Sequence, residues 1–585
     1  MILQALIAYA ERERIGDADF EDVGVRWLIP LTANGRLAGG PIPLAEDPTA
    51  KKTRPKTRSR PFTSPNELTQ TGDKARSYFL CDTLERATLF LDPKSPEKHE
   101  NRRAQHAWFE RLLSEAAESA ATERARLRAV LTFLADTNSL ADLYAQLTNA
   151  KAKPSDNCVF SVDGHDLLEA AALRTFWRAR RRAAASTAAA ERESRVCLAT
   201  GALAPTLDTT EKIKGVPGGL AQGTNLISFD KDSFCSFGLE QAQNAPLSAD
   251  AELKIRSALN ALVAHSREQR LVFNETIYLH WTRDPEPDDF LDLLNNADPD
   301  AVAHLLHALQ SGDEPAGLDA NAYYCLGLSG NGARVVVRDW LETTVPRVRA
   351  AVACWFRDLE LVEADGVSTR AARKFGALLY ALVRADLDEL SPQLPASLLL
   401  AILRGPPGLL PRTVLAAALR RQQLDHDNRT NSARLSLIKA VLNRLPNQPI
   451  TMTAQLDSDS SDPAYLCGRL FAVFDRLQYL ALGGVNAGVV ERYYASASVT
   501  PALVMGRLFR NAQFHLAKAG GGIAENVRKD FETLAAALGA TFPQTLSLEE
   551  QGRFALGYYH QKADYRRQSI ERKAAAAEAK ETTAP

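Results

Sequence analysis

The chain has 585 residues, of which 45% are hydrophobic and 24% charged, a composition typical of a large globular protein with more than one domain. Its 70 basic and 71 acidic residues nearly cancel, which excludes a uniformly basic nucleic-acid-binding protein but allows a local basic patch. No run of about 18 apolar residues occurs, so no membrane span is expected. The seven cysteines are scattered and never in CxxC spacing, which favours a reducing, cytoplasmic location and offers no zinc site.

The first two elements are predicted to be a helix and a strand. Residues 2–13 place apolar side chains at helical spacing, and 23–31 (VGVRWLIPL) has the composition of a strand. The N-terminus has no basic start before its apolar residues and meets acidic residues early. It is therefore interpreted as part of the fold and not as a signal peptide.

A dense run of cations follows, in a segment that Thr, Ser and Pro mark as a loop. Six cations fall within ten residues and no acid interrupts them: Lys51, Lys52, Arg54, Lys56, Arg58 and Arg60. The residues that come next add further polar and aromatic candidates: Phe62, Asn66, Lys74 and Arg76. Such a mixture suits phosphate neutralisation and contact with a nucleic-acid groove. The alternative is a solvated surface loop.

Helices are predicted over 83–91, 105–149 and 165–190, with a short strand at 158–162. The last of these helices carries a second basic cluster, in which Arg174, Arg178 and Arg181 share one face because they are four and then three residues apart. A charged helix face is more often solvated than bound to nucleic acid. The solvated interpretation is therefore favoured here.

The stretch 196–246 is polar and rich in Gly, Asn, Gln and Ser, a composition that helices avoid. Phe229, Phe234 and Phe237 argue against disorder, because they give the segment rings to bury. The stretch is predicted to be a shaped loop-and-strand unit that presents amides and rings to a polar partner. An Ω-like connection that packs its own aromatics is the open alternative.

After this stretch the pattern gives a helix at 247–266, strands within 270–281, a helix at 301–309 and a strand–turn–strand at 323–340, and from 343 onward it is almost wholly helical. The predicted fold class is α+β: a mixed N-terminal body of short strands and helices, then an all-α C-terminal region ending in a helical bundle. Predicted domains are 1–385, a helical connector at 386–451, and the bundle at 452–585, which starts within the Pro-rich linker 446–452.

One bundle helix, 502–518, is clearly amphipathic. Its apolar face is made of Met505, Leu508, Phe509, Ala512 and Leu516. Its polar face carries Arg507, Arg510, Asn511, His515 and Lys518. By itself this polar face is most simply a wet surface.

Motifs for catalysis and for cofactors are missing. The sequence has no GxxxxGK[ST], and the GxG at 330–332 is not completed to GxGxxG, because Val335 stands where the last Gly belongs. His304 and His307, with Asp298 and Asp300 nearby, are a weak metal signal for which structural histidines are the better explanation. We therefore predict no enzyme activity, no cofactor and no metal.

Several blocks, taken together and in order, resemble one family. They are MILQALIAYAER at the N-terminus, YFLCDTLERATLF at 78–90, CLATG at 197–201, KIKGV at 212–216, NLISFDKDSFCSFGLEQAQNAP at 225–246, YYCLGLSGNGARVVVRDWLETTV at 323–345, LRRQQLDHDNRTNSARLSLIKAVLNR at 419–444 and DPAYLCGRLFAVFDRLQ at 462–478. With these blocks the chain resembles the large subunit of type I-C CRISPR effector complexes, the RNA-guided assembly called Cascade. It departs from that family in its glycine loop, GGLAQGTN in place of a GAQSSGA-like run, and in lacking a His between Thr200 and Lys212.

The resemblance implies a non-catalytic subunit. Such a subunit recognises the protospacer-adjacent motif in duplex DNA, promotes unwinding and R-loop formation, stabilises the displaced strand and helps recruit the helicase–nuclease, while guide RNA reads the sequence by base pairing. The implied partners are CRISPR RNA-loaded backbone subunits, double-stranded target DNA and its displaced strand, the small subunit and the helicase–nuclease, with no membrane.

Within the resemblance, roles follow from side-chain chemistry. The run from Lys51 to Arg60 would clamp phosphates. Base edges would be read by Asn66, Lys74, Gln222, Asn225 and Ser228. Phe229 or Phe62 would wedge into, or stack on, an opened base step. Further DNA-binding cations are Arg76, Lys212 and Lys214, and the displaced strand would lie on Arg507, Arg510 and Lys518.

Some complexes of this type obtain their small subunit from an internal start in the large-subunit gene. The chain has only three methionines, Met1, Met452 and Met505, and Met452 lies just ahead of the bundle. Met452 is predicted to be such a start. Two other functions stay open as alternatives: a metal-dependent nuclease with unrecognised acidic ligands, and a pure scaffold subunit that touches no DNA.

Overall fold

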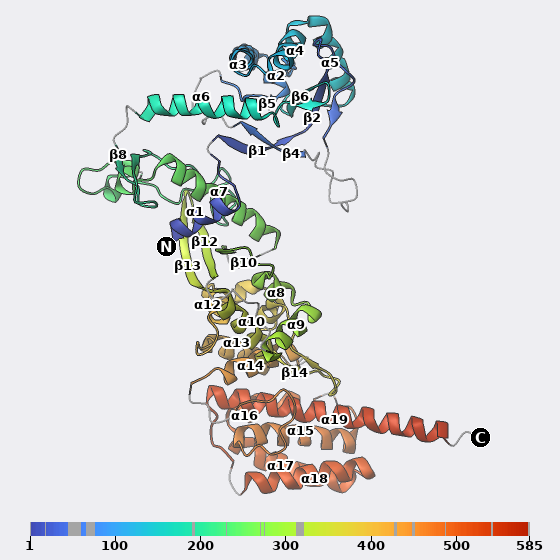
Figure 1. Cartoon of the computed structure of the whole chain (residues 1–585). Helices are drawn as coiled ribbons and strands as arrows, with labels where there is room; N and C mark the ends of the chain where they lie inside the picture. The colour runs from blue at the N-terminus through green and yellow to red at the C-terminus, as the bar shows by residue number, and fades with distance from the viewer. Residues whose placement is uncertain are drawn as a thin grey trace. The chain divides into compact units, whose positions relative to one another are not determined.

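A computed structural model of the chain describes residues 2–17, 19–44, 60–65, 76–189, 194–229, 231–269, 271–273, 275–311, 321–425, 430–446, 451–485, 487–539 and 542–582. The chain divides into two compact units. One comprises Met1–Ile213 and Asn225–Ala261, and the other comprises Lys214–Thr224 and Leu262–Pro585. Figure 1 labels many of the helices and strands of both units.

The first unit begins with α1 (Ile2–Arg12) and contains a small mixed sheet covered by helices. Its strands are β1 (Phe20–Val25), β2 (Trp27–Leu31), β3 (Ile42–Pro43), β4 (Arg60–Pro65), β5 (Cys81–Thr83), β6 (Asn157–Val162), β7 (His165–Asp166), β8 (Ser194–Val196) and β9 (Leu203–Pro205). Its helices are α2 (Leu84–Ala87), α3 (His99–Ser119), α4 (Arg124–Ala135), α5 (Thr137–Asn149), α6 (Ala171–Ala189) and the N-terminal part of α7 (Ala249–Glu268).

The core of the first unit lies around β6, the strand that is buried along five of its six residues. Strand order is β3-β2-β6-β5, with β2 and β6 parallel and β7 paired to β6. Trp177 of α6 is fully buried, stacks on Phe79 at 5.3 Å between ring centroids, and donates its indole N–H to the Asp19 carbonyl at 2.9 Å. Because that hydrogen bond satisfies its one polar atom, the large ring fits inside the core.

The single strand predicted over 23–31 is in fact two strands. β1 ends at Val25 and pairs antiparallel with β4, while β2 begins at Trp27 and pairs with β6. Both halves have strand composition, so the break is set by their different partners. The helix predicted from 165 begins at Ala171, because 165–166 form β7.

The second unit contains the C-terminal end of α7, an antiparallel meander and a series of helices. The meander is β10 (Val272–Phe273), β11 (Thr276–Thr282), β12 (Ala322–Asn331) and β13 (Arg334–Thr344), with a two-stranded hairpin, β14 (Leu361–Val362) and β15 (Thr369–Arg370), further on. The helices before the bundle are α8 (Phe290–Asn296), α9 (Pro299–Ser311), α10 (Val345–Leu359), α11 (Phe375–Tyr380), α12 (Gln393–Arg404), α13 (Arg412–Leu424) and α14 (Ser432–Asn443).

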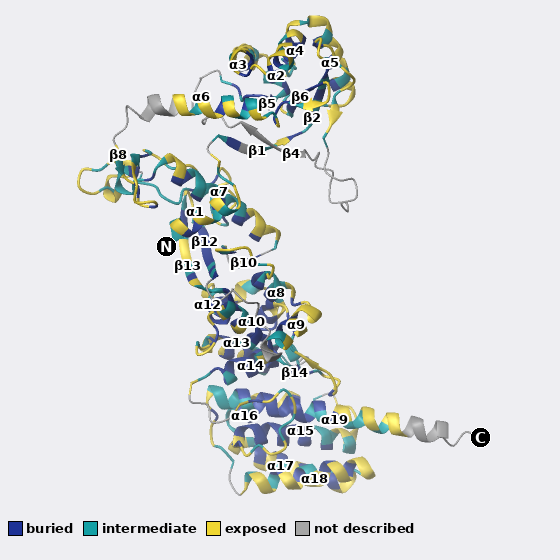
Figure 2. Ribbon diagram, viewed as in Figure 1, coloured by how far each residue is buried: buried dark blue, intermediate teal, exposed yellow. Residues whose placement is uncertain are grey.

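The last five described helices form the bundle: α15 (Pro463–Leu482), α16 (Val489–Val499), α17 (Pro501–Lys518), α18 (Gly522–Leu538) and α19 (Leu548–Thr582). Their core is aromatic, with Phe471 in edge contact with Tyr494 and Tyr558, both at 5.8 Å between centroids. Buried residues follow α15 and the adjoining part of α19 in Figure 2. The predicted α+β class with an all-helical C-terminal region is confirmed.

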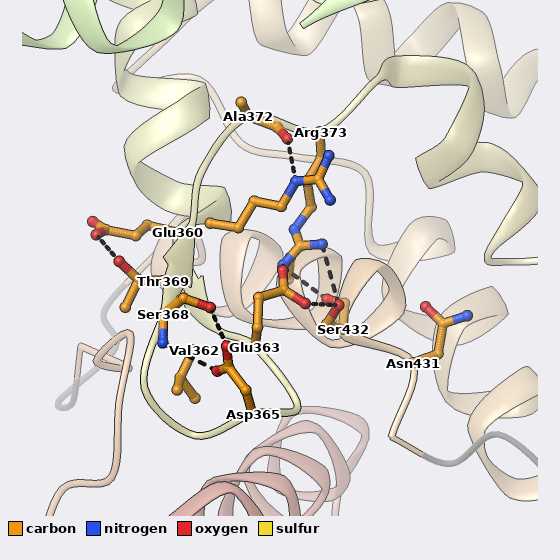
Figure 3. Close-up of polar contacts among 12 residues, drawn as sticks. Glu360, Val362, Glu363, Asp365, Ser368, Thr369, Ala372, Arg373, Asn431 and Ser432 are labelled. Atoms are coloured by element: carbon orange, nitrogen blue, oxygen red, sulfur yellow. Dashed lines mark hydrogen bonds and ion pairs between the residues drawn. The ribbon is translucent and has the colours of Figure 1, made fainter. Parts of the chain in front are cut away.

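The bundle is tied to the helices before it through the β14–β15 hairpin. The Tyr559 hydroxyl of α19 donates to the Val362 carbonyl at 2.7 Å, and a Cβ at Gly366 in the hairpin turn would lie 2.0 Å from the Ala563 carbonyl oxygen. Only glycine allows this backbone approach. Glu363, next to the hairpin, accepts hydrogen bonds from Arg373 at 2.6 Å and from Ser432, the first residue of α14, at 2.9 Å (Figure 3). The predicted domain limits at 386 and 452 stay predictions.

All seven cysteines are free thiols. Among the described helices, none is long and apolar enough to cross a membrane.

Candidate nucleic-acid interface

The basic run predicted to clamp phosphates is only partly covered by the structure. Lys51, Lys52, Arg54, Lys56 and Arg58, and the predicted base readers Asn66 and Lys74, lie outside the described residues. Two other candidates lie on β4, where Arg60 is opposite Val25 and Phe62 is opposite Val23 in the antiparallel register. For these positions the nucleic-acid role stays a prediction.

Arg76 is partly buried, and its guanidinium lies 5.7 Å from the centre of the Trp108 ring. Arg111 contacts the same ring at 5.4 Å. Cation–π contacts of this kind hold a guanidinium over an aromatic face while leaving part of it open. Arg76 is thus held against the face of the Trp108 ring.

The second basic cluster, on α6, is engaged within its own unit. Arg178 pairs with Asp17 at 3.2 Å and lies 5.0 Å from the centre of the Phe20 ring, and Arg181 lies 3.6 Å from Asp19. Burial and the neighbouring Asp17 raise the pKa of Asp19, against the lowering effect of Arg181. These contacts give the cluster a role within the fold, so no nucleic-acid role is assigned to it.

The polar stretch 196–246 is held together by hydrogen bonds more than by a core. The Asn225 amide donates to the Thr210 carbonyl at 2.7 Å, and the Thr210 hydroxyl donates to the Ile227 carbonyl at 2.6 Å. Glu252 of α7 accepts from the Glu211 N–H at 3.0 Å, and its burial raises its pKa. Part of the hydrogen-bonding capacity predicted for base reading by Asn225 is therefore used to shape the loop.

The remaining candidates of this stretch differ in exposure. Lys214 and Gln222 are exposed, whereas Lys212, Ser228 and Phe229 are partly buried. Within the second unit, the segment 214–224 lies against the β12–β13 turn, where the Gly330 N–H donates to the Pro217 carbonyl at 2.6 Å. A Cβ at Gly330 would lie 2.2 Å from the Gly219 nitrogen, so the glycines at this turn serve close backbone contact.

The expectation that the three phenylalanines of this stretch are buried is wrong for Phe237, whose side chain is 100% exposed. Phe234 is also exposed, and Phe229 is partly buried. Phe237 adopts a left-handed backbone conformation with φ 56°, which is unusual for a bulky residue. A turn, and not a core, determines where this ring points.

The turn that carries Phe237 is fixed by one side chain. The side-chain Oδ1 of Asn244 accepts a hydrogen bond from the Ser236 N–H at 2.9 Å. Its side-chain Nδ2 donates to the backbone carbonyls of Leu239 and Gln241 at 2.9 and 3.1 Å. These bonds hold both sides of the turn. The result is an uncovered ring on a braced loop, which sequence reasoning missed in favour of Phe229 and Phe62.

In the bundle, the outer face of α17 carries the predicted displaced-strand residues. Arg507, Arg510 and Lys518 are exposed, and the predicted apolar face is confirmed, with Met505, Leu508, Ala512 and Leu516 buried and Phe509 partly buried against the bundle core. Among the described residues, Arg507, Arg510 and Lys518 make no ion pair with an acid.

The same outer face presents two apolar side chains. Phe514 is 75% exposed and Leu503 is 79% exposed. Phe514 is four residues after Arg510 and four before Lys518, so the ring and both cations share one side of the helix. A ring between cations offers both stacking and phosphate contact.

These features define a class of protein: an α+β chain with an all-helical C-terminal region and exposed rings set among polar and basic side chains. A search of curated proteins found no match to the chain. A family model described as CRISPR-associated protein (Cas_Csd1) matches residues 6–566, nearly the whole length. The chain belongs to this family of CRISPR-associated proteins.

Proposed function

We propose that this chain is the large, non-catalytic subunit of a type I-C CRISPR surveillance complex (Cascade). In this role it recognises the protospacer-adjacent motif in duplex DNA, promotes unwinding and R-loop formation, stabilises the displaced strand and helps recruit the helicase–nuclease. Its partners are the CRISPR RNA-loaded backbone subunits, the small subunit and the target DNA. The family assignment supports the CRISPR setting, and the exposed residues support DNA contact.

The observation that carries the DNA role is the exposed Phe237 ring on its braced turn. Proteins that kink or open a duplex insert apolar side chains between base steps. A wedge that is already held in place loses less conformational entropy on binding. Asn244 supplies the rigidity through three hydrogen bonds. The exposed Gln222 has donors and acceptors suited to a base edge, and Lys214 a charge suited to a phosphate.

For the displaced strand, the outer face of α17 is the proposed platform. Bases would stack on Phe514, and phosphates would meet Arg507, Arg510 and Lys518. Contacts of this kind tolerate any sequence, because every base has a π-face and every nucleotide a phosphate.

The test uses the reconstituted guide-loaded complex and two matched duplexes, one with the motif and one with it scrambled, at two salt concentrations. We expect discrimination between the duplexes to need this chain and to fall in a Phe237→Ala variant. Tyr380→Ala, which removes a ring that is also largely exposed, is the matched control and should behave as wild type. Discrimination that persists without the chain would reject the role in motif recognition.

The two alternatives make different predictions in the same system. A pure scaffold gives a complex whose DNA affinity has the same salt slope with and without the chain. A metal-dependent nuclease gives cleavage of labelled DNA by the purified chain with magnesium or manganese, lost on an acidic substitution.

The proposed internal start at Met452 has a structural consequence. Met452 is buried, and its N–H and carbonyl both bond the Asn443 side chain, at 2.7 and 2.9 Å. In the full chain, Leu556 and Tyr559 of the bundle pack into the core of the preceding helices. A product starting at Met452 would expose this face. Met452→Leu, a volume-conserving change, should abolish the short product in cells while leaving the full chain folded; a short product that persists would reject Met452 as its start.

A further inference from the structure

Three side chains with metal-binding atoms meet in the second unit. His265 lies on α7, His280 on β11, and Asp289 immediately before α8. One ligand atom from each lies within 4.8 Å of the other two. The His280 Nε2 is 3.4 Å from Asp289 Oδ1, and the His265 Nε2 is 3.8 Å from Asp289 Oδ2.

These distances are close to those of a filled site. Around a tetrahedral zinc ion bound at about 2.0–2.2 Å, neighbouring ligand atoms are about 3.4 Å apart. The two contacts with Asp289, one to each carboxylate oxygen, are within a few tenths of an ångström of this separation, and the ligand nitrogens of the two histidines lie within 4.8 Å of each other. Two imidazoles and one carboxylate form a common zinc donor set, in which a fourth position is left for water or another ligand.

The carboxylate is oriented before any ion arrives. Asp289 Oδ1 accepts the Asp292 N–H at 2.9 Å as the cap of α8, and Oδ2 accepts the Gln269 amide at 2.5 Å. Gln269 is in turn fixed by Asn295, whose amide donates to the Gln269 carbonyl at 2.8 Å. Such outer contacts hold ligands in place at metal sites.

The charge of Asp289 is not matched by a fixed cation. Arg349, the nearby guanidinium, pairs with Glu286 at 3.1 Å and with Asp288 at 2.7 Å. Among the described residues, the ion-pair partners of Asp289 are His265 and His280 and no lysine or arginine. A carboxylate beside two histidines can thus be neutralised by a bound cation.

The site is also open on one side. His280 is only 10% exposed, whereas Asp289 is 32% and His265 54% exposed in their side chains. An ion would enter from the solvent side, past the exposed His265. The buried His280 would form the floor of the site.

We propose that His265, His280 and Asp289 bind one divalent transition-metal ion, zinc being the ion that the donor set fits best. Nitrogen and carboxylate donors also accept Co²⁺ and Ni²⁺, which provides a spectroscopic probe. The bound ion would cross-link the end of α7 to β11 and to the start of α8. This proposal is independent of the DNA-binding role.

The test measures binding of Zn²⁺ to the purified full chain, by calorimetry and by competition with a chromogenic chelator, and of Co²⁺ by its visible absorption. We expect one equivalent of Zn²⁺ bound, a Co²⁺ spectrum of tetrahedral intensity, and a rise in melting temperature with added zinc, since an ion that binds only the folded chain stabilises it.

The variants localise the site. His265→Asn changes an exposed ligand, and Asp289→Asn keeps a residue that caps α8 equally well while removing the charge. Each should weaken zinc affinity at least tenfold. His307→Asn, on α9 and outside the cluster, is the matched control and should bind as wild type. No bound metal in the wild type, or equal affinity in all four proteins, would overturn the proposal.

Discussion

The polar stretch 196–246 and the C-terminal bundle are held in shape by different interactions. In the stretch, shape comes from single side chains such as Asn225, Asn244 and Glu252, which hydrogen-bond the backbone of nearby turns. In the bundle, shape comes from rings such as Phe471, which pack on one another in a dry core. Yet each region leaves a phenylalanine ring largely uncovered, Phe237 in the stretch and Phe514 in the bundle.

This difference separates the rings that stabilise the fold from the rings that can contact a partner. A ring inside an aromatic core contributes to folding, and a ring in solvent contributes nothing to folding and is available to a partner. Exposed rings beside amides or cations are thus the residues to vary when binding is to be changed without unfolding.

The largest expected effect is on the bundle core. Phe471→Ala removes a fully buried ring and should lower the free energy of unfolding by about 3–5 kcal/mol. Phe237→Ala removes a fully exposed ring and should change it by less than about 0.5 kcal/mol. Chemical denaturation of both variants, followed by tryptophan fluorescence, checks the contrast. Similar losses in the two would show that Phe237 has a packing role.

A second prediction concerns the pH dependence of stability, which His560 in the bundle should influence. Burial, with Lys439 and Arg469 nearby, lowers the pKa of His560 to about 3, and the ring hydrogen-bonds the Tyr465 hydroxyl at 2.9 Å. Above the unfolded pKa of about 6.5, His560 is neutral in both the folded and the unfolded chain, so its ionisation does not change the free energy of unfolding. Below it the unfolded chain takes up a proton that the folded chain refuses until about pH 3.

Stability should therefore fall from about pH 6.5 downward, by about 2 kcal/mol at pH 5 from this residue. Urea titrations between pH 7 and 5 measure it. In His560→Gln the fall should be shallower, whatever the variant's stability at pH 7. An unchanged slope would mean that His560 is protonated in the folded chain.

A third, smaller effect belongs to the polar stretch. Asn244→Ala removes three hydrogen bonds that brace the Phe237 turn, which should raise amide exchange at Ser236 by about tenfold to a hundredfold, equivalent to about 1–3 kcal/mol. Global unfolding should stay near wild type, because the turn lies outside any core. Exchange measured by mass spectrometry, with Asn260→Ala on α7 as a control, tests this. Unchanged exchange would mean that the turn holds its shape without Asn244.

The sequence predicted best what depends on local periodicity. The buried face of α17 follows from residues three and four apart, so Met505, Leu508 and Ala512 were identified correctly. The break between β1 and β2 was missed, because it depends on partners about 40 and 130 residues away. Family resemblance, which rests on whole blocks, pointed to the CRISPR setting that the family match confirms.

The candidate sites depended on contacts that no local pattern contains. A phenylalanine such as Phe237 is expected to be buried. Its exposure follows from the turn that the hydrogen bond between the Ser236 N–H and the Asn244 side chain helps to fix. His265, His280 and Asp289 come from a helix, a strand and a helix start, so no ligand spacing reveals them. His304 and His307, which do have a helical spacing, lie outside that cluster.

The smallest expected effect tests the outer face of α17. Phe514→Ala should weaken binding of the displaced strand by about 1 kcal/mol, roughly fivefold, since one base loses its stacking partner. The salt dependence should stay the same, because no charge is removed. Arg510→Ala on the same face should instead reduce the salt slope by about one counterion. Binding of single-stranded DNA to the reconstituted complex at several salt concentrations measures both. If Phe514→Ala altered the slope and Arg510→Ala did not, stacking and phosphate contact would have to be reassigned on this helix.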